Sequence, residues 1–541
     1  MYTKIIYFLI IACWLLPTGC SDENQPDNPA PEILLREAQD ITRTSARLTG
    51  TVNASSNSKT DRYRFRYGTS LQMEQMDEQS LKNSHVSTEL QDLIPGTTYY
   101  YCLEAGNKKY LKQSPIYSFM TIPNEVPKVD KINFLGQGPI SIILQCAIMD
   151  NGGETILKNG FCYTKTNGEE YELSAPLSDS NQWQLRIGDL EKDTQYTVRA
   201  FAENKIGRAY SEPYHFQTGS AVILTSAGTL PKIIGEEEKN EYNTLNIVGP
   251  LNGTDIRFIR EMSGKDITGN PTPGILQQLD LTDALIVSGG TSYDESRHTE
   301  DHTIGYGMFG ELEVLKEIKL PASTLIIEQN AFKNSTALTK LSIPSNTEVL
   351  TPSTGCKNLS HISIASGNTH YTSMDGVVYN KSGEVLVWFP EGIMGDNIQF
   401  SPTLKSIGDY ALQKCKIRSI VLPNSLSSIG KQAFCESEIK SVILPDGLRS
   451  ISTGLFQNCK SLTSVTLGSK CESISAYSFD NCPLQHLYVK ASTPPVCHSE
   501  TFSGAESIFA NCILHIPLES RTQYRNHNIW KQFLHIEGVA F

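Results

Sequence analysis

The sequence predicts a mainly β protein, in which two β-sandwich domains precede a solenoid of short repeats. The solenoid is predicted from a phrase that recurs every 22 or 23 residues between Phe309 and Phe502, with a phenylalanine, a leucine, an aliphatic-proline pair and an isoleucine at fixed places. Units of this length cannot bury their apolar faces alone and stack on a shared core. The sandwiches are predicted from short alternating strands and from a turn phrase that occurs twice, its tyrosines Tyr99 and Tyr196 lying 97 residues apart.

Length and charge narrow the class of protein. The chain has 541 residues, too many for one ordinary core, so several domains are expected. Its formal charge of −12 provides no basic surface for phosphate backbones. We therefore expect no nucleic-acid partner.

Residues 1–19 are predicted to be a lipoprotein signal peptide. Their apolar run, residues 5–16, is too short to cross a hydrocarbon core of about 30 Å. The run ends in Leu-Pro-Thr-Gly-Cys, which resembles a bacterial lipobox and implies that Cys20 is acylated. An ordinary secretory signal cleaved near Gly19 is the alternative.

Residues 20–32 are predicted to be a flexible tether, because after Cys20 they are polar, acidic or proline and cannot build a core. The Ser-Asp-Glu directly behind the cysteine resembles the surface-export signal of some outer-membrane lipoproteins. This resemblance implies a lipid-anchored protein of the outer membrane that faces the cell exterior. Several acyl chains on one residue are enough for stable anchoring in the membrane.

Residues 33–123 and 124–219 are predicted to be the two sandwiches. In each, a leucine and a threonine precede Tyr99 or Tyr196 at the same spacing, which resembles the tyrosine corner of fibronectin type III domains. The resemblance implies an immunoglobulin-like fold, in which the tyrosine ring enters the core and its hydroxyl bonds back to the chain. Trp183 is interpreted as a core aromatic. Because the chain has no Arg-Gly-Asp sequence, the sandwiches are interpreted as a spacer.

Residues 220–308 are predicted to be the N-terminal cap region of the solenoid, with a looser pattern than the repeats. We expect a strand at 245–251, a helix at 255–262 that starts at Thr254 or Asp255, and a strand at 279–284.

Residues 309–541 are predicted to be repeats that end in a C-terminal cap. Leu315 to Pro321 and Ile417 to Phe434 follow the phrases L-x-x-I-x-L-P and S-I-G-x-x-A-F, which resemble BspA-type leucine-rich repeats of bacterial surface proteins. The resemblance implies a leucine-rich-repeat solenoid with a binding role at the cell surface. Bulky side chains near the end, with Trp530 expected to be buried, are interpreted as the closing cap.

The repeat pattern is interrupted between Ile364 and Leu404, where alternating residues around an Asp-Gly turn predict a hairpin. Tyr371, Tyr379 and Trp388 in this segment are the candidate ligand-binding residues, because their rings offer flat faces for sugars. Aromatic residues in alternating strands are more often packed against neighbours, and we weigh the structural interpretation above the binding one.

Thirteen cysteines in a secreted protein would ordinarily suggest disulfides. Five of them instead occupy related places in the repeats, shortly before a buried aliphatic, where a thiol acts as a small hydrophobe. We expect a column of buried thiols, formed by Cys356, Cys415, Cys459, Cys482 and Cys512. No paired C-x-x-C spacing indicates a metal site, and the histidines and acids of the loop at 289–303 match no known ligand pattern.

The sequence predicts neither an enzyme nor a cofactor. It contains no G-x-S-x-G, no H-E-x-x-H and no Gly-rich phosphate loop followed by lysine. The leading hypothesis is a surface-bound adhesin held in the membrane by its N-terminal acyl anchor, whose solenoid recognises a protein or matrix ligand. The alternative is a glycan-binding accessory lipoprotein of a polysaccharide-uptake system, and polymer hydrolysis is a third possibility.

Overall fold

The structure is a computed structural model that describes residues 30–53, 60–80, 84–107, 111–165, 168–395, 398–504 and 507–541. The predicted signal peptide, Cys20 and most of the predicted tether lie outside these residues. The chain divides into two compact units, of which the first takes residues 1–129, 148–158 and 202–209 and the second takes the rest. None of the helices in the described part of the chain has the length and apolar character needed to cross a bilayer.

The first sandwich consists of two antiparallel sheets with a common core. Its strand β2 alternates buried and exposed residues, so that Leu48 and Val52 face inward, where they join Phe65 and Leu103 from the opposite sheet. The first sheet contains β1 (Glu32–Leu35), β2 (Ala46–Asn53) and β5 (His85–Leu90). The second contains β3 (Arg62–Gly68), β4 (Gln75–Gln79), β6 (Thr98–Gly106), β7 (Leu111–Gln113) and β8 (Tyr117–Met120).

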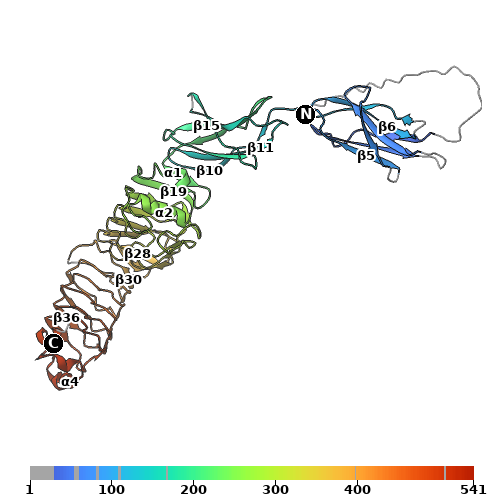
Figure 1. The fold of residues 1–541 in the computed structure, drawn as a ribbon. Helices are drawn as coiled ribbons and strands as arrows, with labels where there is room; N and C mark the ends of the chain where they lie inside the picture. Colours follow the sequence, from blue (N-terminus) through green and yellow to red (C-terminus); the bar gives the residue numbers. More distant parts are fainter. Residues whose placement is uncertain are drawn as a thin grey trace, which may run out of the picture. The chain divides into compact units, whose positions relative to one another are not determined.

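The second sandwich repeats this arrangement (Figure 1). One sheet contains β9 (Lys128–Val129), β10 (Asn133–Gln137), β11 (Ile142–Asp150) and β14 (Gln182–Ile187). The other contains β12 (Lys158–Lys165), β13 (Glu170–Ser174), β15 (Gln195–Asn204), β16 (Gly207–Tyr210) and β17 (Tyr214–Gln217). Trp183 is 2 % exposed and packs beside Phe161, with ring centroids 6.0 Å apart, which confirms it as a core aromatic.

Both tyrosine corners are present with the same geometry. The hydroxyl of Tyr99 accepts a hydrogen bond from the backbone N–H of Ile94 at 3.0 Å, and that of Tyr196 accepts one from Glu191 at 2.9 Å. Both rings are buried and stack on a phenylalanine of the strand that follows. The resemblance found in the turn phrase therefore extends to the hydrogen bond that defines the motif.

The second sandwich and the solenoid share one sheet. Strand β18 (Ala221–Leu224) pairs antiparallel with β10 and parallel with β19 (Thr244–Leu251), so the sheet continues from β14 through β11, β10, β18 and β19 into the coils. The short helix α1 (Leu230–Ile234) packs at this junction, where Ser141 Oγ donates to the carbonyl of Ile233 at 2.9 Å. The predicted cap region therefore continues a sheet of the second sandwich.

Helix α2 (Gly253–Met262) begins earlier than predicted. Asn252 is its N-cap and accepts from the N–H of Thr254, while Asp255 accepts from the N–H of Asn252 and completes a capping box. The expected start at Thr254 or Asp255 was wrong because Asp255 serves as the acidic third residue of the box instead of the cap.

The strand expected at 279–284 is two strands, β20 (Gln278–Asp280) and β21 (Ala284–Ile286), because Asp280 accepts from the N–H of Thr282 and forms a turn.

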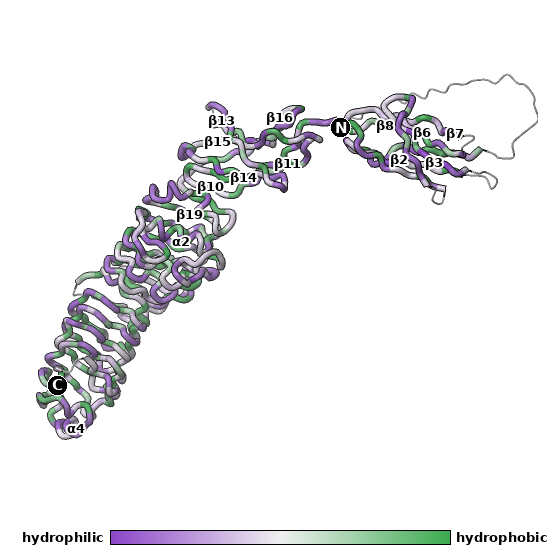
Figure 2. The backbone as a smooth tube through the Cα atoms, viewed as in Figure 1, coloured by the Kyte–Doolittle hydropathy of each residue, from purple (hydrophilic) through white to green (hydrophobic). Residues whose placement is uncertain are grey.

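Most of the following coils contribute short strands that pair in parallel with the next coil, and the ladders end at β26 and β27 before the hairpin. In Figure 2 hydrophobic and hydrophilic segments alternate along these coils. The early coils contain β22 (Thr303–Ile304), β23 (Glu317–Lys319), β24 (Ile326–Ile327), β25 (Lys340–Ile343), β26 (Val349–Leu350) and β27 (His361–Ile364). The later coils contain β31 (Ser406–Ile407), β32 (Ser419–Ile420), β33 (Ser428–Ile429), β34 (Ser441–Ile443), β35 (Ser450–Ile451), β36 (Ser464–Leu467), β37 (Ser473–Ile474), β38 (His486–Val489) and β39 (Val496–Cys497).

The recurring phenylalanines form stacks inside the solenoid. Neighbouring rings lie with centroids 5.5 to 6.1 Å apart and are nearly parallel, which is the offset stacking that aromatic pairs favour. The stacked pairs are Phe309 with Phe332, Phe434 with Phe456, Phe456 with Phe479, and Phe479 with Phe502. The period read from the sequence is therefore the period of the core.

The coils turn at corners that hold two residues of positive φ, four positions apart. The pairs are Gly307 and Glu311, Asn330 and Asn334, Tyr410 and Lys414, Gln432 and Glu436, Gly454 and Asn458, and Tyr477 and Asn481. Most of these residues are not glycine, so each corner carries a backbone conformation that L-residues rarely adopt.

The C-terminal end closes the solenoid with α3 (Ile508–Asn511), β40 (Ile513–Pro517), η1 (Leu518–Ser520), α4 (Arg521–Asn526), η2 (Trp530–Gln532) and β41 (His535–Val539). Trp530 is fully buried, as predicted, and its Nε1–H donates to the carbonyl of Pro495 at 2.8 Å. The hydroxyl of Tyr524 donates to the carbonyl of Ala491 at 2.7 Å. These bonds satisfy carbonyls of the last coil that no further coil would reach.

Candidate binding surface

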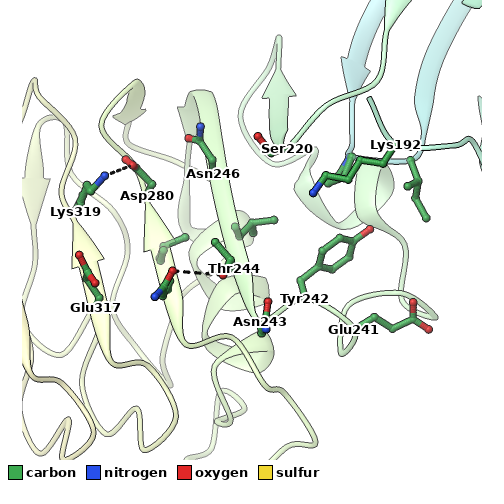
Figure 3. Close-up of a pocket in the computed structure, with 15 residues that line it drawn as sticks. Lys192, Ser220, Glu241, Tyr242, Asn243, Thr244, Asn246, Asp280, Glu317 and Lys319 are labelled. Carbon is green, nitrogen blue, oxygen red and sulfur yellow. Dashed lines mark hydrogen bonds and ion pairs between the residues drawn. The ribbon is translucent and has the colours of Figure 1, made fainter. Parts of the chain in front are cut away.

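A hollow of about 500 Å³ lies where the second sandwich meets the first strands of the solenoid (Figure 3). Lys192, from the turn between β14 and β15, reaches over one side of it, and Tyr242 points into it from the loop before β19. The opposite wall is formed by side chains of β19, β20 and β23. The polar residues of this wall are Thr244, Asn246, Gln278, Asp280, Glu317 and Lys319.

The charged groups of the wall are partly paired. Lys319 Nζ lies 2.8 Å from Asp280 Oδ2, and this hydrogen bond raises the pKa of Lys319. Burial raises the pKa of Asp280, but hydrogen bonds from Lys319 and Thr282 outweigh it and the net pKa is lowered. Both groups are therefore charged at neutral pH. Glu317 and Lys192 form no ion pair among the described residues, so their charges are available to a ligand.

The wall of the hollow continues along the sheet as two polar rows. Between the rows, Leu245, Leu279 and Ile318 face the core, because side chains alternate across a strand. The first row, in register across five strands, is Thr244, Gln278, Glu317, Lys340 and His361. The second is Asn246, Asp280, Lys319, Ser342 and Ser363. We call these residues the polar rows.

The candidate residues taken from the sequence lie outside this surface. The hairpin is present as β28 (Tyr371–Met374) and β29 (Val377–Asn380), joined by Asp375 and Gly376 at positive φ, and is followed by β30 (Val385–Trp388). Tyr379 and Trp388 are 1 % and 2 % exposed, so both rings are packed in the interior, and their binding of a sugar stays a prediction. The hydroxyl of Tyr371 is occupied by the backbone of Glu348 and Leu350.

The five predicted thiols are buried, and those of Cys356, Cys459 and Cys482 donate to a phenylalanine carbonyl of the preceding coil. The Sγ atoms of Cys459 and Cys482 lie 3.0 and 2.9 Å from the carbonyls of Phe434 and Phe456 in the preceding coil. Ser335 occupies the equivalent place and donates to the carbonyl of Phe309. Burial raises the pKa of Cys415 to about 12, so its thiol stays protonated.

The loop at 289–303 uses its polar groups for its own folding. Asp294 accepts from the backbone N–H of Arg297 and pairs with the same guanidinium at 2.8 Å, and Asp301 accepts from the N–H of Ser288. His302 contacts the carbonyl of Ser323. Across the described ranges, no group of three or more His, Cys, Asp or Glu side chains is arranged to hold a metal ion.

The repeats match a known repeat family. Residues 298–380 and 392–515 match the BspA-type leucine-rich repeat region in six copies. The C-terminal half is a BspA-type leucine-rich-repeat solenoid. The match to the BspA-type repeat begins at residue 298, before the first repeat read from Phe309, and its gap, residues 381–391, follows β29 and contains β30.

The solved structures that match parts of this chain include two bacterial proteins and one from chicken. A leucine-rich cell-surface protein from Faecalibacterium prausnitzii is 17% identical, with 63% of this chain and 97% of that chain covered and a TM-score of 0.37. The pneumococcal vaccine antigen PcpA is 18% identical, with 55% and 80% covered and a TM-score of 0.36. The FN1–FN3 domains of chicken CNTN1 are 17% identical, with 36% and 69% covered and a TM-score of 0.18. No curated protein matches this chain.

The polar rows were not found by sequence reasoning. Their members are ordinary polar residues at every second position of strands such as β20 and β23. They can be recognised as rows only when the register between the strands is known. The usable signal was the alternation itself, because aligning the repeat phrases on their buried isoleucines and leucines would have placed the outward residues in rows.

Proposed function

We propose that this protein is a lipid-anchored, non-enzymatic binding protein of the bacterial cell surface. The polar rows recognise a protein or matrix ligand, and the sandwiches act as a spacer. The proposal is supported by the surface role of the BspA-type repeat family and by one structural observation, which is the two unbroken rows of outward polar residues beside the hollow. Solenoid sheets offer extended faces of this kind to large ligands.

A protein ligand is favoured over a glycan by the chemistry of this face. The rows mix both signs of charge, with Asp280 and Glu317 beside Lys319 and Lys340, which suits complementary charges on another protein. Sugar-binding faces need exposed aromatic rings, and Tyr242 is the aromatic residue that lines the hollow. Tyr379 and Trp388 are buried and offer no such face.

The ligand class is tested by exposing the purified chain, residues 21–541, to matrix-protein and glycan arrays. A matched variant carries Glu317→Lys with Lys340→Glu, a swap that keeps the two neighbouring charges complementary within the fold. We expect binding to protein spots and at least about a tenfold loss of affinity in the swap variant, because the order of charges is reversed.

The control exchanges another neighbouring pair, Glu384→Lys with Lys405→Glu, which lies between later coils and away from the polar rows. This control should bind like the unmodified chain. Binding to glycan spots that the Glu317 and Lys340 swap removes would establish the uptake-accessory function instead. Binding unaffected by the swap would refute the polar rows as the ligand surface.

The anchor and the surface location are tested on cells. We expect the Cys20→Ala variant to leave the membrane fraction, and protease added to intact cells to cleave the unmodified protein. Cleavage only after the outer membrane is opened would place the protein on the periplasmic side and contradict the proposed exposure.

A further inference from the structure

Two histidines and a carboxylate meet on the open face of the last coils. His486 lies on β38, His515 on β40 and Glu537 on β41, all strands of the C-terminal sheet. In this sheet Tyr488, His515 and Glu537 are in register on three neighbouring strands, and His486 lies two residues before Tyr488 on the same face. The three residues are far apart in sequence and are brought together by the stacking of the coils.

The two imidazoles face each other through ring nitrogens. His486 Nδ1 lies 3.1 Å from His515 Nε2. The ring of Tyr488 stacks against that of His515, with centroids 4.1 Å apart and planes within 8° of parallel, so the His515 ring is held in one orientation. Packing against Tyr488 thus orients the ring nitrogen of His515 toward His486.

The second nitrogen of His515 has a carboxylate partner. His515 is 7 % exposed, and its Nδ1 is fully buried without a hydrogen bond from the described residues. Glu537 Oε2 lies 3.4 Å away, close enough for the carboxylate to attract a proton to Nδ1. A neutral ring with its proton on Nδ1 presents a lone pair at Nε2, toward His486.

We propose that His486 and His515 bind one divalent transition-metal ion of the Zn²⁺ or Cu²⁺ class, with Glu537 as a positioning residue. Two nitrogens at about 2.0–2.1 Å from one tetrahedral zinc ion stand roughly 3.3 Å apart, near the observed separation of 3.1 Å. A carboxylate behind the distal nitrogen is the usual partner of a metal-bound histidine. Imidazole ligands suit zinc and copper, whereas calcium and magnesium prefer oxygen.

The site takes two ligands from the protein. Because no group of three His, Cys, Asp or Glu ligands is found in the part of the chain that the structure describes, solvent or a bound partner completes the coordination. Such an open site lies on the outward face of the sheet, where His486 and Tyr488 are partly exposed.

The proposal is tested by titrating the purified chain with ZnCl2 and CuCl2 in a calorimeter, with MgCl2 as the hard-cation comparison. We expect one ion per chain for zinc and copper and none for magnesium. His486→Gln and His515→Gln should each abolish the binding or weaken it at least about tenfold, and Glu537→Gln should weaken it by about tenfold. Glu537→Asp should restore part of the affinity, which a purely structural effect would not.

His535→Gln is the matched control, because His535 is an exposed histidine on the same sheet. Circular dichroism spectra checked on each variant ensure that loss of binding is not loss of fold. The copper complex should also show two nitrogen ligands in its electron paramagnetic resonance spectrum. Absence of zinc and copper binding, or binding that survives both His486→Gln and His515→Gln, would overturn the site and leave a hydrogen-bonded histidine pair.

Discussion

At the scale of single residues, the solenoid is built from positions whose roles recur in several of its coils. A phenylalanine stacks on its neighbour, a thiol or hydroxyl three residues later donates to the carbonyl of the previous phenylalanine, and two residues of positive φ turn the corner. The thiols of Cys459 and Cys482 are therefore hydrogen-bond donors as well as small apolar groups, a role that spacing in the sequence did not reveal.

The donor role of the thiols predicts unequal effects of two substitutions. Cys482→Ser keeps a group that donates to the carbonyl of Phe456, as Ser335 does for Phe309. Cys482→Val fills the space but removes this hydrogen bond, so that the carbonyl of Phe456 keeps only the backbone N–H of Cys459 as a donor, at a cost of about 0.5–1.5 kcal/mol. We expect the melting temperature of the Val variant to fall below that of the Ser variant. Equal melting temperatures would show that the thiol contributes volume alone.

The corner conformation predicts the effect of adding a methyl group. Gly454 has φ of 63°, in the left-handed region, and a Cβ there would stand 2.9 Å from Gln432 Cγ. Gly454→Ala should destabilise the solenoid by about 1–2 kcal/mol, measured as a shift in the denaturant midpoint. The control is Gly219→Ala, where an added Cβ meets nothing within 4 Å and φ is ordinary. A shift no larger than that of the control would refute strain at the corner.

At the scale of elements, the segment after β30 introduces a buried acid into an apolar solenoid. Glu391 is 4 % exposed and accepts a hydrogen bond from the backbone N–H of Gly355, which ties the interruption to an earlier coil. Burial raises the pKa of Glu391 to about 7, so the folded state favours the protonated form. The segment that interrupts the repeats is therefore fixed to the earlier coil by the carboxyl of Glu391, whose charge changes near neutral pH.

The raised pKa predicts a stability that falls as pH rises. Below the unfolded pKa of about 4.5 the carboxyl is protonated in both states and there is no penalty. Between about 4.5 and 7 the unfolded state ionises first, and the penalty grows to roughly 3 kcal/mol above pH 7. Glu391→Gln, which mimics the neutral acid, should be more stable than the unmodified chain at pH 8 and equal to it at pH 4. A stability difference between the two that is independent of pH would contradict this.

At the scale of the whole molecule, the sequence predicts the repeats well and their connections poorly. The core of the solenoid is predictable because residues one repeat apart, such as Phe456 and Phe479, stack on each other. The sandwiches are predictable because each tyrosine corner, at Tyr99 and Tyr196, forms between residues close together in the sequence. The polar rows and the pair of His486 with His515 depend on register between strands far apart in sequence. The pairing of β10 with β18 joins two predicted domains, and no local pattern signals it.

The shared sheet predicts that the solenoid needs the second sandwich for its stability. A fragment of residues 220–541 exposes the edge of β18 and the apolar side of α1, where Ile143 and Ile233 otherwise share a core. We expect this fragment to aggregate or to melt well below a fragment of residues 124–541, because an open strand edge templates association. Light scattering and thermal melts compare the two. Equal stability and a monomeric short fragment would show that the junction is dispensable.

The join between β10 and β18 also determines how load travels when a bound ligand is pulled. Tension at the polar rows passes into the second sandwich through backbone hydrogen bonds that lie side by side, as well as along the covalent chain. The backbone hydrogen bonds between β10 and β18 then share the force with the peptide that links β17 to β18. Under the proposed function, a pull on the ligand would therefore reach the second sandwich through the shared sheet as well as through the covalent chain.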